Sequence, residues 1–313
     1  MSAVADAPSR APSRPAHRRW AAPYLFLLPA GVLFIAFLAV PMAYAVSLSF
    51  RGMRVGGGGP FGVREETWVG FENYVRTFTD AEFLAGFGRL AIYGLIAVPL
   101  TLGLALLFAL FLDLPRIRAA RFSRVAIFIP YAVPGVIASL LWGFLYLPST
   151  SPLNWILNQL GLPDVVVLSG GGLYPAIANI AVWGGVGFNM IIIYTSLRGI
   201  PSEIYEAARI DGATERAIAW RIKIPLVAPA LVLTGLFSLI GTLQVYGEPT
   251  TLRPMTNEIS QTWVPLMQIY RDAFARDDLS LAASSSVVLA LGTLVVSIVV
   301  LRATQRSSFG GDG

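Results

Sequence analysis

The chain contains no cysteine, and it has only one histidine and one lysine among its 313 residues. Without cysteine it forms no disulfide, no thiolate nucleophile and no cysteine-ligated metal site. The histidine, His17, lies in the polar N-terminal tail, so no buried imidazole remains for a Ser-His-Asp triad or a zinc site. The lysine, Lys223, follows Ile222, which excludes a phosphate-binding G-x-x-x-x-G-K-[ST] loop. If the protein uses ATP, another chain must bind it.

Charged residues are scarce as well. Asp, Glu, Lys and Arg make up 13% of the sequence, 55% of the residues are apolar, and the mean hydropathy is +0.66. Soluble globular proteins carry about 25% charged residues, which they need to cover a surface that faces water. The composition therefore indicates a chain whose outer surface is solvated by lipid.

Long apolar runs account for this composition. A helix crosses the hydrocarbon core of a bilayer with about 20 residues, and backbone groups inside lipid must bond to one another. Six runs without Asp, Glu, Lys, Arg or His meet this length: Tyr24 to Phe50, Leu90 to Leu112, Val125 to Leu147, Leu173 to Leu197, Leu226 to Gly247, and Leu279 to Leu301. We therefore expect an all-α integral membrane protein with six transmembrane helices. The first run is too long for the apolar part of a cleaved signal peptide.

These runs divide the chain into segments. We expect a basic tail over 1–22, a first transmembrane helix over 23–50 and an external segment over 51–85 with a flexible glycine run at 56–59. A five-helix core then spans 86–303 and contains a polar connection at 200–225, and a second tail spans 304–313. Residues 152–157, which include Trp155, suggest a short helix in the lipid headgroup region. Three glycines between Trp183 and Gly187 indicate that the fourth run is a crowded interior helix.

Basic residues are distributed unequally over the two expected faces. The side that holds both termini carries 15 basic and 7 acidic residues, and the other side carries 8 and 11. Because Lys and Arg are enriched in cytoplasmic loops, both termini are predicted to be cytoplasmic. This asymmetry explains the basic pI of about 9.7, so nucleic-acid binding is not required.

The polar connection at 200–225 predicts two short helices. Ser202 is a suitable N-cap for the first, Gly212 suits the left-handed residue that closes it, Thr214 is a suitable N-cap for the second, and Pro225 ends it. Each helix has apolar or small residues on one side, namely Ile204, Ala207, Ala208, Ile218 and Ile222. No other segment of the chain is expected to pack against this face. The helix pair therefore predicts docking into a groove of a partner protein. The alternative is a loop helix that lies on the membrane.

The same connection resembles a known motif. Glu206-Ala207-Ala208, Gly212 and Ile222-x-Ile224-Pro225 match the EAA---G---------I-LP loop of ABC importer permeases at every interval, with Ile224 where Leu is usual. Residues 68–74, 129–136, 142–144 and 197–201 are similar to the sugar-importer branch of that family, the maltose and glycerol-3-phosphate type. The resemblance covers residues 20–303.

The resemblance implies a type I ABC importer permease in a bacterial cytoplasmic (inner) membrane. Such a permease forms a heterodimer with a second homologous permease, contacts two cytoplasmic ABC ATPase subunits that bind ATP and Mg, and receives solute from an external solute-binding (lipo)protein. It is not itself an enzyme and holds no cofactor. The motif assigns the ATPase contact to Glu206, Ala207, Ala208, Asp211, Gly212, Ala213, Ile222 and Pro225.

A carbohydrate pathway needs hydrogen-bonding groups and aromatic faces. The candidates in or beside the apolar runs are Trp142, Tyr146, Asn179, Trp183, Asn189, Tyr194, Gln244, Tyr246 and Glu248. We expect a di- or oligosaccharide as the substrate. Glycerol-3-phosphate or another polyol phosphate is the alternative, although a phosphate favours arginine and the six runs contain none.

Two other classes of protein compete with this interpretation. An ion-coupled secondary transporter usually keeps an ionisable residue inside the membrane, and a membrane-embedded enzyme needs paired carboxylates or histidines at depth. The six runs contain neither. Solute uptake that survives ATP depletion while the proton gradient is intact would contradict the ABC interpretation.

Overall fold

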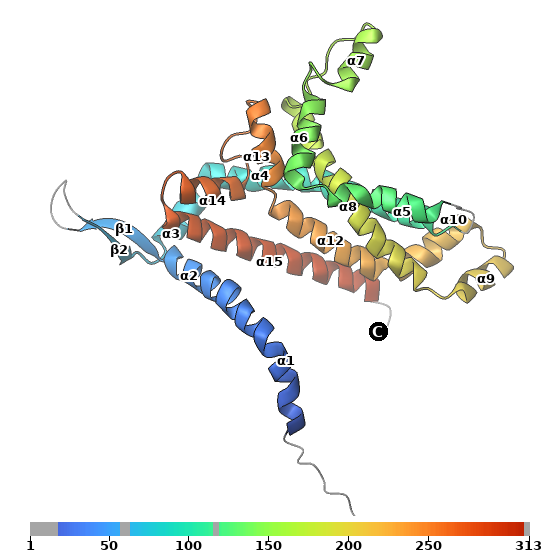
Figure 1. The fold of residues 1–313 in the computed structure, drawn as a ribbon, viewed down its shortest axis with the longest axis horizontal. Coiled ribbons are helices and arrows are strands. Elements are labelled where there is room, and N and C mark those ends of the chain that lie inside the picture. The colour runs from blue at the N-terminus through green and yellow to red at the C-terminus, as the bar shows by residue number, and fades with distance from the viewer. Residues whose placement is uncertain (1–17, 57–62, 115–118, 310–313) are drawn as a thin grey trace, which may run out of the picture.

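The computed structural model describes residues 18–56, 63–114 and 119–309, and these residues are mostly helical (Figure 1). Several predictions concern residues outside these ranges: His17, most of the basic tail, the glycines at 57–59, Arg116, Arg118 and the last four residues of the second tail.

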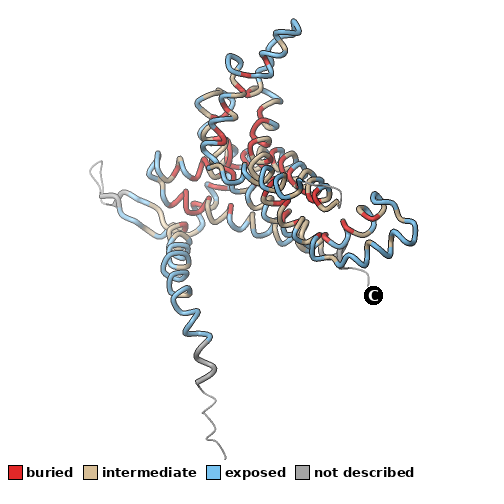
Figure 2. The backbone as a smooth tube through the Cα atoms, turned by 45° about the vertical axis from the view of Figure 1, so that its right-hand side comes forward, coloured by how far each residue is buried: buried red, intermediate tan, exposed pale blue. Residues whose placement is uncertain are grey.

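The first expected membrane helix is present. It consists of α1 (Arg18–Phe34), a five-residue π-helical turn η1 (Ile35–Ala39) and α2 (Val40–Ser49). The π turn ends two residues before Pro41, whose missing N–H cannot continue the α-helical hydrogen bonding. Residues Pro23–Ser49 are long and apolar enough to cross a bilayer. None of the most apolar stretch of this helix is buried by the rest of the chain, as its exposed backbone in Figure 2 shows.

The segment after this helix corrects the all-α prediction. Strands β1 (Arg51–Gly56) and β2 (Val63–Trp68) pair antiparallel, with Arg51 opposite Trp68. The base of this hairpin is held by stacking of Phe50 on Trp68, with ring centroids 5.4 Å apart. The buried Asn73 side chain, in α3 (Glu72–Thr79), donates hydrogen bonds to the carbonyls of Ser49 and Arg51. Local aromatic and amide contacts therefore stabilise a small sheet beside the helices of the described residues.

Four long helices build the core: α4 (Ala81–Leu112), α8 (Leu173–Arg198), α12 (Ala228–Leu243) and α15 (Leu279–Phe309). They run side by side, with α4 and α8 sharing the most extensive contact (Figure 1). α14 (Pro265–Phe274) packs against α15 near the hairpin. The buried residues concentrate in this bundle, and small side chains such as Ala105 and Ala109 let α4 approach Met190 and Ile193 of α8.

The third expected membrane helix is wrong as a single straight element. α5 (Ala120–Phe128) and the 3-10 turn η2 (Ile129–Ala132) are followed by α6 (Gly135–Tyr146), and the two parts are bent by 95°. Val133 between them is extended, with φ −77° and ψ 126°. A residue before proline is forced out of the helical region, so Pro134 accounts for the bend.

The fifth expected helix is present as α12 over most of its length, and a break lies at its start. α10 (Glu215–Ile218), the π turn η4 (Ala219–Lys223) and α11 (Ile224–Leu226) meet α12 at an angle of 65°. The break falls at Val227, two residues beyond Pro225 and two before Pro229, which has no N–H for the preceding turn. Within the described residues, four helices are long and apolar enough to cross a membrane, or up to six if each bent pair is one span.

Shorter elements complete the chain. α7 (Pro152–Gln159) is the short helix expected at 152–157, and Ser151 caps it by accepting a hydrogen bond from the Asn154 N–H. It lies at the tip of an arm that extends away from the bundle (Figure 1). The 3-10 turn η3 (Gly170–Gly172) leads into α8, α13 (Gly247–Leu252) and the 3-10 turn η5 (Arg253–Met255) follow α12, and α9 (Ser202–Ile210) follows α8.

The prediction of a crowded interior helix is confirmed for α8. A Cβ atom on Gly187 would lie against the Ile127 carbonyl oxygen and 2.7 Å from the Phe128 Cα. Backbone atoms cannot turn aside as a flexible side chain can, so only glycine permits this approach of α8 to α5. Gly184, on the same helix, has open space at the corresponding position.

This contrast gives a matched test. We expect Gly187→Ala to lower the free energy of unfolding by about 1 to 3 kcal/mol through overpacking. Gly184→Ala should be neutral or slightly stabilising, since alanine favours helix over glycine by about 1 kcal/mol. Thermal unfolding of both variants in detergent measures the difference. Equal stability of the two would contradict the close approach.

Candidate functional site

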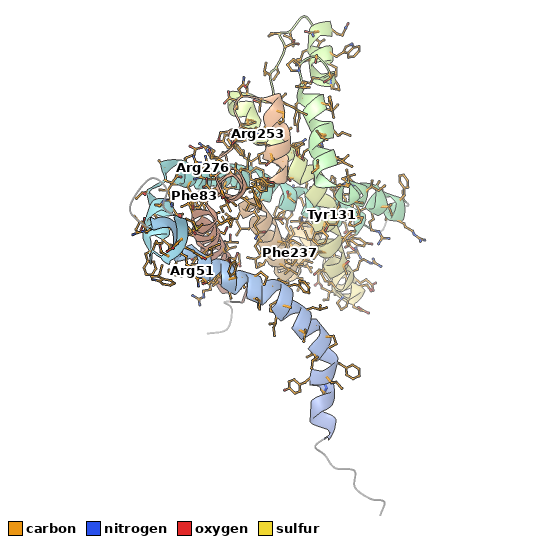
Figure 3. The ribbon with its side chains drawn as sticks, turned by 60° about the vertical axis from the view of Figure 1, so that its left-hand side comes forward. Arg51, Phe83, Tyr131, Phe237, Arg253 and Arg276 are labelled. Atoms are coloured by element: carbon orange, nitrogen blue, oxygen red, sulfur yellow. The ribbon has the colours of Figure 1, made fainter. Side chains whose placement is uncertain are left out.

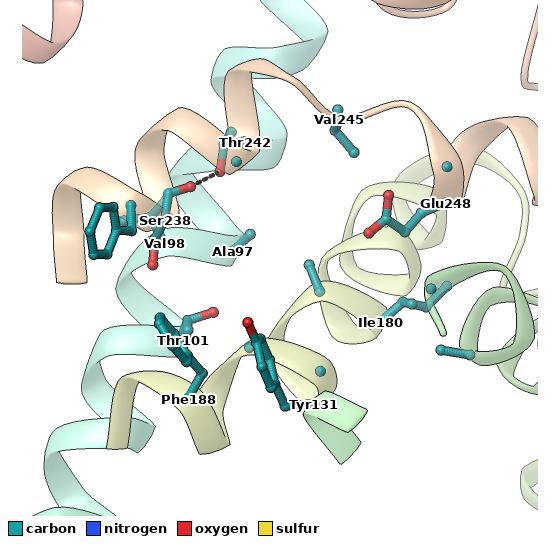
Figure 4. A pocket seen from close by; sticks show the side chains of 18 of the residues that line it. Ala97, Val98, Thr101, Tyr131, Ile180, Phe188, Ser238, Thr242, Val245 and Glu248 are labelled. Atoms are coloured by element: carbon teal, nitrogen blue, oxygen red, sulfur yellow. Dashed lines mark hydrogen bonds between the residues drawn. The ribbon is translucent and has the colours of Figure 1, made fainter. Parts of the chain in front are cut away.

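A cavity of about 540 Å³ lies in the middle of the bundle. Its walls come from α4, η2, the start of α6, α8, α12 and the segment after α12 (Figure 4). The bends at Val133 and Val227 turn Tyr131 of η2 and Phe237 of α12 toward one region of the bundle (Figure 3). The volume falls within the range of small-molecule sites, about 300 to 1,000 Å³.

Aromatic faces and polar groups alternate around the cavity. The aromatic lining residues are Tyr93, Tyr131, Phe188, Phe237 and Tyr246. The uncharged polar lining residues are Thr101, Asn189, Ser238, Thr242 and Gln244. Tyr131 stacks on Phe188 with ring centroids 4.9 Å apart and an interplanar angle of 17°, which fixes the plane of its ring. Flat apolar faces with scattered polar groups suit a ligand that has both, such as a carbohydrate.

Glu248 brings the one formal charge among the described residues that line the cavity. Its carboxylate is directed into the cavity, on the side opposite Tyr131 (Figure 4). Burial raises the pKa of this carboxyl, because desolvation disfavours the charged form. A ligand that donates hydrogen bonds to the carboxylate would favour its ionised form.

The sequence candidates for the pathway fall into three groups. Asn189, Gln244, Tyr246 and Glu248 line the cavity. Trp142, Tyr146, Asn179 and Trp183 instead form a neighbouring cluster that ties α6 to α8. In that cluster the Tyr146 hydroxyl donates to the Ala176 carbonyl at 3.0 Å and accepts from the Asn179 amide at 2.9 Å. The Trp142 indole N–H is buried and has no hydrogen-bond partner among the described residues, and none of the four residues lines the cavity.

Tyr194 lies elsewhere again. It borders a separate hollow near the α9 end of the bundle, and the Arg124 guanidinium lies 4.9 Å from the centre of its ring. Seven further residues line the cavity that were not predicted from the sequence: Tyr93, Thr101, Tyr131, Phe188, Phe237, Ser238 and Thr242. The two prolines that flank Tyr131 were the available signal, because they break the helix and turn that residue inward.

A second feature lies at one end of the bundle, where α9 stands apart from the core (Figure 1). Gly212 follows the helix with φ +83°, and the Gly212 and Ala213 N–H groups donate to the carbonyls of Arg209 and Ala208. This is a Schellman motif, so the predicted left-handed closure is confirmed. Thr214 caps the next helix through the Ala217 N–H, also as predicted. The predicted Ser202 cap is wrong: Ser202 is the first helical residue, and Pro201 before it has no side-chain cap bond.

The motif residues of this loop are largely accessible. None of the α9 residues is buried, Glu206, Ala207, Asp211, Gly212 and Pro225 are exposed, and Ala208, Ala213 and Ile222 are half-buried. Ile210 exposes 86% of its surface at the end of the helix. A space of about 630 Å³ separates α9 from the ends of α4 and α8. The helix thus offers apolar and acidic residues away from the core.

A buried ion pair connects this loop to the core. The Lys223 Nζ lies 2.5 Å from the Asp113 carboxylate at the end of α4, and both side chains are about 95% buried, with exposures of 5% and 6%. Arg198, at the end of α8, reaches the same carboxylate at 4.0 Å. The Lys223 ammonium also lies 4.9 Å from the centre of the Tyr205 ring of α9, and burial together with Asp113 raises the pKa of the Tyr205 hydroxyl. The four side chains join α4, α8, α9 and η4.

Removing one partner of this pair leaves an uncompensated buried charge. We expect Lys223→Met or Asp113→Leu alone to cost about 3 to 5 kcal/mol of unfolding free energy, whereas the double variant recovers most of it. As a control, Glu72→Gln breaks the exposed pair with Arg54 and should cost at most about 1 kcal/mol. Unfolding in detergent measures all four variants. Additive losses in the double variant would contradict a direct pairing.

The arrangement defines a class of protein: a multi-pass membrane transport component, with a small-molecule cavity inside an apolar helical bundle and an exposed helical loop at one end. Residues 101–308 match the family described as "binding-protein-dependent transport system inner membrane component", and the chain belongs to this family. The resemblance drawn from the 206–225 motif is thereby confirmed at the level of the family.

Named relatives are similar over most of the chain. The diacetylchitobiose uptake system permease protein NgcF of Streptomyces coelicolor is 30% identical over 293 residues, which cover 90% of this chain and 81% of that protein. The sn-glycerol-3-phosphate transport system permease protein UgpA of Salmonella typhimurium is 30% identical over 295 residues, covering 93% and 96%.

A solved structure shares the fold. A chain in the crystal structure of a bacterial ABC transporter involved in the import of the acidic polysaccharide alginate superposes with a TM-score of 0.76, at 22% identity, over 93% of this chain and 96% of that chain. At this identity the similarity concerns the fold alone.

Proposed function

We propose that the chain is a permease subunit of an ATP-driven ABC importer, and that it forms part of the pathway for a carbohydrate handed over by an external solute-binding protein. Transport proceeds by alternating access, through rigid-body motion of packed helices. In this proposal each bent helix pair is one span, which gives six spans with both termini in the cytoplasm of a bacterial cell.

The observation that carries the proposal is the position of α9. It presents Glu206 and Ala207 to solvent, next to Gly212 in a rigid Schellman turn. Three residues join it to α8, and η4, α11 and α12 lead from its other side to the cavity. A partner that pulls on α9 therefore acts on two walls of the cavity. We assign the ATPase contact to this loop, from Glu206 to Pro225.

The family, the missing phosphate-binding loop and the unburied first helix together indicate the partners. Because the sequence has no phosphate-binding loop, we assign the binding of ATP and Mg to two separate ATPase subunits. The apolar helix α1–α2, with none of its most apolar stretch buried, is covered by lipid and by a second homologous permease in a heterodimer.

A carbohydrate is the preferred substrate because five aromatic and five uncharged polar residues line the cavity and a permease for diacetylchitobiose is among the relatives. The glycerol-3-phosphate permease relative favours a polyol phosphate as the second candidate. No arginine or lysine lines the cavity in the described part of the chain, which weighs against that second candidate.

Reconstitution tests the proposal. In proteoliposomes that contain this chain, the second permease, the ATPase and the binding protein, we expect sugar uptake to require ATP and to stimulate its hydrolysis. The purified chain alone should hydrolyse no ATP, because it has no phosphate-binding loop. Uptake that persists without ATP but follows a proton or sodium gradient would contradict the proposal and favour a secondary transporter.

The loop has a matched control within the chain. Gly161, which closes α7, has φ +69°, open space at its Cβ position and the same Schellman hydrogen bonds as Gly212. An aspartate should cost about 1 kcal/mol of local backbone strain at either position. We expect Gly212→Asp to abolish uptake and stimulated ATP hydrolysis while the protein remains in the membrane.

Gly161→Asp should retain both activities, because that turn lies on the α7 arm, away from α9. Uptake and ATP hydrolysis of the two variants are compared at equal amounts of assembled complex. Equal activity of the variants would show that the α9 turn is not the point of coupling.

A further inference from the structure

Some of the hydrogen-bonding groups that line the cavity are already engaged within their own helices. The Asn189 amide nitrogen already donates to the Gly185 carbonyl at 2.8 Å, and the Thr242 hydroxyl donates to the Ser238 carbonyl at 2.9 Å. Two of the donors on the cavity wall are therefore used within the helices that carry them.

Two acceptor groups of the wall, those of Asn189 and Glu248, have capacity left. Asn189 is only 6% exposed, and its side-chain oxygen has no hydrogen-bond partner among the described residues. A buried polar atom without a partner costs free energy, which a ligand hydrogen bond would recover. The Glu248 carboxylate adds two further acceptor oxygens, and no ion pair within the described residues engages it.

The charge of the lining residues also favours ligand groups that donate hydrogen bonds. Glu248 is its single formal charge, and no lysine, arginine or histidine lines the cavity within the described ranges. A carboxylate or phosphate on a ligand carries acceptors only. Hydroxyl groups of the wall, such as that of Tyr131, can still donate to an acidic group, but beside Glu248 this group would meet a like charge with no lining cation to offset it. A hydroxyl, an amide N–H or an ammonium group would meet its complement at Glu248.

We propose that Glu248, together with the Asn189 side-chain oxygen, selects carbohydrates without acidic groups and rejects acidic ones. This inference rests on the proposed function and narrows it to neutral or amino-bearing sugars. Glu248 accepts hydrogen bonds from sugar hydroxyls, while Tyr131 and Phe188 supply a fixed aromatic surface across the cavity. The negative charge of Glu248 disfavours the binding of an acidic carbohydrate.

The test measures ligand binding to the assembled permease and ATPase complex in detergent, without the solute-binding protein, so that the selectivity of that protein does not enter. The probes are diacetylchitobiose as a neutral sugar, an alginate disaccharide as an acidic sugar, and glycerol 3-phosphate. Calorimetric titration gives the ratio of their dissociation constants.

In the unmodified complex we expect the neutral probe to bind at least roughly tenfold more tightly than either acidic probe, because like charges placed together cost more than a tenfold change represents. Glu248→Gln keeps the size of the side chain and removes the charge, so it should reduce this ratio to near one. Glu248→Asp keeps the charge and should keep the preference.

Glu258→Gln is the matched control, because Glu258 is exposed and lies outside the cavity. It should leave the ratio unchanged. A ratio that Glu248→Gln does not alter, or an acidic probe that binds the unmodified complex as tightly as the neutral one, would overturn the inference while carbohydrate binding itself persists. Carbohydrate uptake that fails in every form of the reconstituted complex contradicts the proposed function instead, so the two failures are distinguishable.

Discussion

The close approach of α8 to its neighbours is the constraint on which the rest of the structure depends. Gly187 brings the helix backbone against the carbonyl of Ile127, and the alanines of α4 allow a similar approach on another side. Inside lipid there is no difference in hydrophobicity to drive helices together, so close van der Waals packing of this kind decides which helices associate. Because α8 is fixed in this way, its Gly184, Gly185 and Asn189 are fixed as a wall of the cavity.

The same helix also connects the cavity to the α9 loop. Its last residue, Arg198, lies beside Asp113, and the Asp113–Lys223 pair holds the far side of the loop to α4. Since the pair is buried, its geometry is maintained by the free energy that separating the two charges would cost. The loop is thus attached at defined points, including the contact of Tyr205 with Lys223, although no residue of α9 is itself buried. A helix with few contacts that is held by rigid attachments is suited to transmit a displacement.

Much of the fold follows from the sequence alone. Apolar length predicted the helices that became α1–α2, α4, α8 and α15, because the cost of burying unpaired backbone groups in lipid leaves helices as the only solution for such runs. The Gly212 turn and the Thr214 cap were predictable for a similar reason, since each depends on one residue and its nearest neighbours in sequence. Hydropathy does not change at a bend, so the breaks at Val133 and Val227 were predictable only from the neighbouring prolines.

The site was less predictable, because polarity in a membrane helix does not reveal the direction of a side chain. Tyr146 and Asn179 resembled ligand-binding residues in sequence, yet they bond to each other across α6 and α8. Tyr131 and Phe188 line the cavity although they stand in ordinary apolar runs. Which of two equally polar residues faces the cavity depends on the rotation of each helix, and contacts between residues distant in sequence set that rotation.

The position of Glu248 connects selectivity with motion. Glu248 lies in α13, a few residues beyond the end of α12 at Leu243. The helix α12 begins at the Val227 break, and α11 links it to Lys223, the last residue of η4. A displacement of the loop that turns α12 would therefore carry the carboxylate with it and change how it meets a ligand. In a site built on one charge and few free acceptors, a small change of distance alters the interaction strongly, since the electrostatic energy varies inversely with separation. The short helix α13 thus places the proposed selecting group where a motion of the loop would change its distance from a bound ligand.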